Sequence, residues 1–177
     1  AIQNTGVGTS SLDSITTGMQ NTALGYNTGG SLTTGQRNVI LGHQAFNNAT
    51  GNSNIAIGYS AIYQGTGDDN VAIGQQAMRL LTTGNTSVAV GSYAGYGITT
   101  GVNNTFTGYQ AGNSLTTGGN NTILGYDADA SSATVSNEIT IGNTSATRFR
   151  LPGLQAGGSD GQVLTYIASS GIIDLAT

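Results

Sequence analysis

The chain has 177 residues and a formal net charge of −4, and only 7% of its side chains are charged, whereas 29 residues are glycine and none is cysteine. Without cysteine, disulfides and thiolate metal sites are excluded. The only basic residues besides one histidine are four arginines (Arg37, Arg79, Arg148 and Arg150), which form no stripe for nucleic acid, and no apolar run approaches the roughly 20 residues of a membrane span.

A short motif recurs along residues 4–145. NTALGYNTGGSLTTG (21–35) returns almost letter for letter as NTFTGYQAGNSLTTG (104–118). The glycine after a short apolar run recurs at intervals of 16 or 17 residues, at Gly8, Gly25, Gly42, Gly58, Gly74, Gly91, Gly108, Gly125 and Gly142. This period is too short for two-helix repeats. It predicts an all-β parallel β-solenoid (β-roll or β-helix) of about nine 16–17-residue coils over residues 1–145.

Each copy contains one predicted strand, for which Val71–Ile73 serves as the example. The positions of Val71 and Ile73 are β-branched or leucine in almost every copy, which suits a half-buried strand. We expect these two rows to face the solenoid interior. The Ala72 row then faces outward, and its large members Ile40, Phe106 and Ile123 are expected to line the axis of a homotrimer, because an exposed apolar row needs a partner.

Other rows predict the corners of the coil. An asparagine precedes most strands, and stacked asparagines that hydrogen-bond from coil to coil suit such a corner. The row consists of Asn4, Asn21, Asn38, Asn54, Asn70, Asn104 and Asn121. A second inward anchor is expected before the TTG turn, at Ile15, Leu32, Leu81, Ile98 and Leu115.

The repeat ends near residue 145, and residues 146–177 are predicted to be a C-terminal transition or linker segment. A short strand is expected in QVLTYIA (162–168). Arg148 and Arg150 alternate around a phenylalanine, and we expect them to form inter-chain ion pairs that involve Glu138.

The repeat resembles two families. NIAIGYSA (54–61), NVAIGQQA (70–77) and SVAVGSYA (87–94) are similar to the head repeats of trimeric autotransporter adhesins. SLTTGQRNVILGHQA (31–45) and SLTTGGNNTILGYDA (114–128) more closely resemble the LTTGxxNTxxGYxAG arrays of bacteriophage tail and capsid fibres. The resemblance implies a homotrimer, intertwined or side by side, with other virion fibre or tail and capsid proteins as partners.

The resemblance implies a non-enzymatic structural and adhesive segment of a phage fibre, exposed on the virion surface. The alternative is the head of a bacterial trimeric surface adhesin. The residues that follow the repeat glycine are the candidate host-contact edge, because aromatic rings with polar tips suit sugars. They are Tyr26, His43, Tyr59, Tyr109 and Tyr126.

Other functions have less support in the sequence. A polysaccharide-degrading tailspike needs a groove of catalytic groups, which short uniform coils do not build, and an ice-binding face needs two rows of threonine where TTG offers one. Asp68 with Asp69, and Asp127 with Asp129 and Glu138, are weak candidates for acid–base or calcium chemistry. We therefore expect no catalytic residue, no metal and no cofactor.

Overall fold

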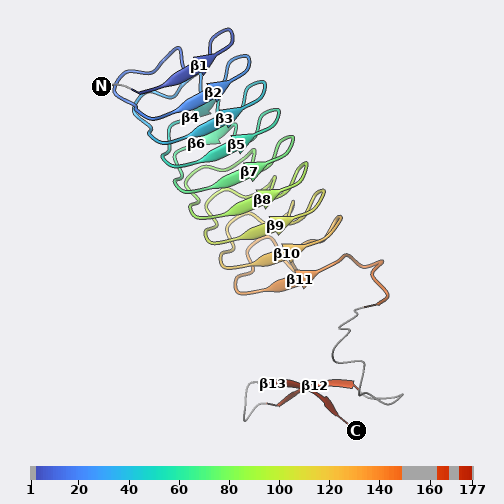
Figure 1. Ribbon diagram of the computed structural model, residues 1–177. Coiled ribbons are helices and arrows are strands. Elements are labelled where there is room, and N and C mark those ends of the chain that lie inside the picture. Colours follow the sequence, from blue (N-terminus) through green and yellow to red (C-terminus); the bar gives the residue numbers. More distant parts are fainter. Residues whose placement is uncertain (1–2, 149–162, 168–171, 177) are drawn as a thin grey trace. The chain divides into compact units, whose positions relative to one another are not determined.

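The computed structural model describes residues 3–148, 163–167 and 172–176, and the chain divides into two units, Ala1–Ser145 and Ala146–Thr177. In the first unit nine short strands form one parallel sheet, one strand per coil (Figure 1). In sheet order these are β1 (Thr5–Val7), β2 (Thr22–Leu24), β3 (Val39–Leu41), β5 (Ile55–Ile57), β7 (Val71–Ile73), β8 (Val88–Val90), β9 (Thr105–Thr107), β10 (Thr122–Leu124) and β11 (Ile139–Ile141).

The pairing confirms the predicted β-solenoid. Leu41 pairs with Ile57, and Ile57 with Ile73, so equivalent residues of successive copies lie directly over one another. In the described part of the chain all regular structure is β, and no helix is present. The two 16-residue copies add a small parallel sheet, β4 (Asn48–Ala49) with β6 (Gln64–Gly65).

The second unit contains one antiparallel pair of strands. β12 (Val163–Ile167) coincides with the strand expected in QVLTYIA, and β13 (Ile172–Ala176) was not predicted.

The prediction of which strand residues point into the solenoid is wrong. The Ala72 row points into the solenoid, where Ala72, Ile40, Phe106 and Ile123 are all fully buried within a single chain. Ile40, Phe106 and Ile123 therefore cannot line an axis between chains. The rows of Val71 and Ile73 point outward, and Leu24, in the Ile73 row, is 52% exposed.

The opposite wall of the coil explains this orientation. Phe46, Ile62 and Met78 are buried against the strands, and they fill the space that alanines leave in the strand row. Where the strand residue is large, the wall of the preceding coil carries glycine, as Gly29 does before Ile40 and Gly95 before Phe106. A Cβ at Gly95 or Gly112 would collide with the ring of Phe106. The interior keeps a roughly constant volume because large and small residues alternate between its two walls.

The predicted asparagine ladder is confirmed and buried. The Oδ1 atom of Asn21 accepts from the backbone N–H of Asn38 at 2.9 Å, and Asn38 Oδ1 accepts from Asn54 N at 2.8 Å. Each Nδ2 also donates across the coil, as from Asn54 to the carbonyl of Gly67 at 2.9 Å. Ser87 and Glu138 occupy the equivalent positions where asparagine is missing. The ladder thus satisfies backbone groups that the corner would otherwise leave unpaired.

The glycines of both rows stand where successive coils approach most closely. Gly74, in the row after the strands, has φ +138°, and a Cβ there would collide with the carbonyl of Gly91 on the next coil. Gly84, in the TTG row, would meet Gly101 in the same way. The second anchor is also confirmed, because Leu32, Leu81, Ile98 and Leu115 are fully buried and Ile15 is partly buried.

We predict that Phe106→Ala will destabilise the solenoid by about 3–5 kcal/mol, because the ring leaves a cavity that the neighbouring glycines cannot fill. Chemical denaturation followed by circular dichroism measures the loss. Thr117→Ala, an exposed substitution on the same coil, is the control and should change stability little. Similar losses in both variants would contradict the assignment of Phe106 to the core.

Candidate functional site

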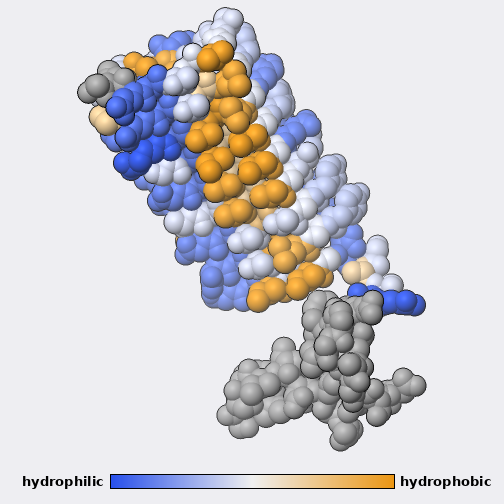
Figure 2. Space-filling model, viewed as in Figure 1, coloured by the Kyte–Doolittle hydropathy of each residue, from blue (hydrophilic) through white to orange (hydrophobic). Residues whose placement is uncertain are grey.

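The outer face of the main sheet is an apolar stripe. Its two rows include Val39, Ile55, Val71 and Val88 on one side and Leu41, Ile57, Ile73 and Val90 on the other. Figure 2 shows the stripe running along the stacked strands between hydrophilic flanks. Exposure varies along it: Ile55, Ile57, Val71 and Val88 are half-buried, whereas Ile73 is 37% and Ile139 74% exposed. The exposure of these side chains shows that no other element of the unit covers this face completely.

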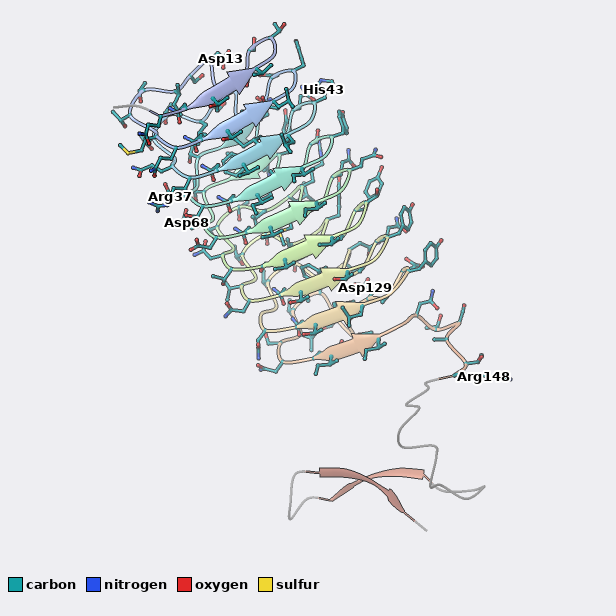
Figure 3. All side chains as sticks on the ribbon, in the orientation of Figure 1. Asp13, Arg37, His43, Asp68, Asp129 and Arg148 are labelled. Carbon is teal, nitrogen blue, oxygen red and sulfur yellow. The ribbon has the colours of Figure 1, made fainter. Side chains whose placement is uncertain are left out.

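The candidate host-contact residues lie together on one edge of the solenoid. Each follows a repeat glycine with positive φ, which turns the chain out of the strand direction. The ring centroids of Tyr26 and His43 are 5.2 Å apart, and those of His43 and Tyr59 are 5.3 Å apart. Figure 3 places His43 at the side of the sheet opposite Arg37 and Asp68.

This aromatic edge is interrupted. Gln75 and Ser92 occupy the same position on the next two coils, and the row resumes with Tyr109 and Tyr126, whose rings stack at 5.4 Å with an interplanar angle of 13°. Tyr109 and Tyr126 are 43% and 67% exposed. The structure therefore gathers the five candidate residues into two short aromatic runs, and their contact with a host remains a prediction.

A further aromatic cluster beside this edge was missed. Tyr93 lies 5.9 Å from Tyr96 and 6.2 Å from Tyr109 between ring centroids. On the preceding coils the guanidinium carbon of Arg79 lies 5.2 Å from the ring centroid of Tyr63. Tyr63, Arg79 and Tyr96 share one repeat position, five residues after the glycine. Aligning all positions of the repeat, instead of the glycine neighbours alone, would have revealed this column.

The candidate acidic groups serve local structure. Asp68 Oδ1 accepts from the backbone N–H of Asn52 at 2.7 Å, and the backbone N–H of Asp68 donates to Asn85 Oδ1 at 2.8 Å. Asp68 is thus one rung of a second, outer ladder. Asp129 Oδ1 accepts from the backbone of Ala130 at 2.9 Å. Among the residues that the structure describes, no three His, Cys, Asp or Glu side chains group in a way that could hold a metal ion.

The carboxylate of Glu138 is engaged within its own chain. Its Oε1 accepts from the backbone N–H of Ser131 at 2.8 Å and from Thr140 Oγ1 at 3.0 Å. Hydrogen bonding from the side chain and the backbone of Ser131, and from Thr140, lowers the pKa of Glu138 against a small opposing effect of burial. Arg148 is exposed, and Arg150 lies outside the described residues, so the expected inter-chain ion pairs remain a prediction.

We predict that Glu138 stabilises the last coil in a pH-dependent way. Because the pKa is lowered on folding, its contribution is present above the ordinary carboxyl pKa of about 4.3 and is lost as the pH falls through the folded value. Glu138→Gln should therefore lower the unfolding midpoint at pH 7, and the difference from the unchanged protein should shrink as the pH falls below about 4.3. Thr140→Val removes one of the hydrogen bonds to Glu138, so in that background Glu138→Gln should lower the unfolding midpoint at pH 7 by less. If the effect of Glu138→Gln on the midpoint does not shrink as the pH falls, this account is wrong.

No protein-family model, curated protein or solved structure matches this chain. In the part of the chain that the structure describes, no helix has the length and apolar character needed to span a bilayer. What the protein does must therefore be inferred from its repeat and its surfaces.

Proposed function

We propose that this chain is a non-enzymatic structural and adhesive segment of a trimeric virion fibre, from a phage, that spaces or presents a host-binding surface. The observation that carries the proposal is the apolar stripe on the outer face of the sheet, which extends along most of the coils and is broken by Thr105 and Thr107 at β9. The similarity of the repeat to phage fibre arrays supports the virion setting.

The stripe has the dimensions of a functional surface. With coils about 4.8 Å apart, nine strands make it about 40 Å long, and two rows of side chains make it roughly 10 Å wide. Its area of roughly 400 Å² falls within the range of the largest apolar patches on monomeric proteins, which are often functional. Its neighbours along the coil are asparagines, threonines and glycines, which give the patch a polar rim.

A second and third copy of the same chain suit this face best. Equivalent residues of the two rows stack along the solenoid, so copies that run in parallel bring aliphatic side chains together at most coils and threonines together at β9. A closed ring of three buries the stripe of each chain and leaves no apolar face open. The sequence resemblance supports three-fold symmetry, and the interface is assigned to the Val71 and Ile73 rows in place of the buried Ala72 row.

The other surfaces fit a stiff rod that displays repeated groups. Each coil hydrogen-bonds to the next through the backbone and the asparagine ladder, which resists bending and local opening. Three copies of the aromatic edge would repeat any weak contact three times, so that avidity could replace a deep pocket.

We predict that the protein has three times its 17.7 kDa chain mass in solution at micromolar concentration. Ile73→Asp should give monomers, because it places like charges on the facing stripes near the middle of the rod. Light scattering after size-exclusion chromatography measures both masses. Thr83→Asp adds the same charge at an exposed position of the same coil, away from the stripe, and should leave the assembly intact.

Circular dichroism separates assembly from folding, since Ile73→Asp should keep the β spectrum. A monomeric mass for the unchanged protein would contradict the proposed assembly.

We predict that the purified protein competes with virus particles for adsorption to host cells, because the same surface would be presented in both. Inhibition of adsorption at rising protein concentration is the measurement. If the protein does not compete for adsorption but fibres fail to assemble without it, only the spacer role remains. Cleavage of host polysaccharide by the purified protein would contradict the non-enzymatic assignment.

A further inference from the structure

Beside the aromatic edge, two coils enclose a shallow cleft. It has a volume of about 350 Å³ and is lined by Tyr93 and Tyr96 from the coil of β8 and by Gln110 and Asn113 from the coil of β9. All four side chains are half-buried. The volume lies at the lower end of the range for small-molecule sites. None of the four belongs to a strand, so the cleft lies off the apolar stripe.

The two tyrosine hydroxyls are oriented from the preceding coil. Gln75 Nε2 donates to the hydroxyl of Tyr93 at 3.5 Å, and Arg79 Nη1 donates to the hydroxyl of Tyr96 at 3.5 Å. Each hydroxyl accepts one hydrogen bond there and keeps its own proton for another acceptor. The cleft thus combines two aromatic rings, two hydroxyl donors and two amides on adjacent coils.

A charged side chain, Arg79, lies on the coil before the cleft. The guanidinium of Arg79 lies against the ring of Tyr63 and donates to Tyr96, and its Nε is buried without a hydrogen-bond partner among the described residues. Arg79 therefore meets the cleft through the hydroxyl of Tyr96 and is not itself among the lining residues. The four lining residues are uncharged, which favours a neutral ligand over a phosphate, a sulfate or an acidic sugar.

We propose that this cleft binds a pyranose unit of a neutral oligosaccharide. The sugar's C–H face packs against Tyr93 and Tyr96, whose rings are apolar on their faces and polar at their tips. The sugar hydroxyls accept from the tyrosine hydroxyls and exchange hydrogen bonds with the amides of Gln110 and Asn113. Tyr109, 6.2 Å from Tyr93, extends the aromatic surface toward a second sugar unit.

This inference rests on the proposed adhesive function for its biological meaning, and it names the class of ligand. The chain has eight tyrosines and no tryptophan, so tyrosine signals report on the cleft. The experiment titrates the intact protein, labelled with ¹³C-tyrosine, with cellotetraose, maltotetraose and chitotetraose, and follows the ring resonances by NMR. Tyrosine-to-phenylalanine variants assign the signals.

At least one sugar should shift the ring signals of Tyr93 and Tyr96. Tyr93→Ala and Tyr96→Ala should each weaken binding about tenfold, which is the effect expected from the loss of one packed ring and its hydrogen bond. Met19→Ala, an exposed substitution on the first coil and outside both aromatic runs, is the control and should bind like the unchanged protein. The unfolding midpoint of each variant verifies its fold.

The outcomes separate the two proposals. If none of the three sugars shifts Tyr93 and Tyr96 in an intact trimer, the cleft proposal is wrong and the fibre proposal stands. Binding that survives both tyrosine substitutions would also overturn it. Specific shifts in a protein that proves monomeric would support the cleft and contradict the trimeric assembly.

Discussion

Close stacking of one coil on the next is the constraint on which the rest of the structure depends. At a spacing of about 4.8 Å, every residue lies over its own equivalent, so each position must tolerate a copy of itself as a neighbour. Backbone hydrogen bonds cross between coils outside the strands as well, as from Asn27 to Thr9 and from Gln44 to Tyr26, both at 2.9 Å. Glycine recurs where this spacing leaves no room for a Cβ, and asparagine recurs where a buried corner needs both a donor and an acceptor.

The same stacking makes the interior thin, so its volume must be balanced between two walls. Alanines of the strand row face Phe46, Ile62 and Met78, whereas Phe106 extends into the space beside Gly95 and Gly112. Residue size varies along each wall of the solenoid, but large residues on one wall face small residues on the other, so the combined side-chain volume stays similar. A large residue in an otherwise small row therefore indicates a compensating glycine on the opposite wall, and it does not indicate a contact between chains.

The outer surface is divided between two chemistries. Side chains of the strands that point outward are mostly aliphatic and form the stripe, whereas many of the residues beyond the positive-φ glycines are aromatic or amide and form the edge and its cleft. The turn at each glycine separates the two surfaces. One can therefore be covered by other copies of the chain while the other stays open to a ligand, which is the arrangement that a fibre with an adhesive surface requires.

The sequence by itself determined the period, the layer pairing and the corner ladders. Each depends on residues 16 or 17 positions apart, which stack whatever the shape of the coil between them. The direction in which the strands face could not be predicted. A three-residue strand such as Val71–Ile73 is apolar at both parities, and alternation alone does not say which parity is inside.

Only the tertiary structure decided that orientation, because the bulk of Phe46, Ile62 and Met78 on the opposite wall leaves space for alanine and none for a second row of valine and isoleucine. The cleft has the same origin. The repeat places Gln110 over Tyr93 and Asn113 over Tyr96, but the half-buried hollow between them arises from side-chain packing on the folded coils, which periodicity does not encode.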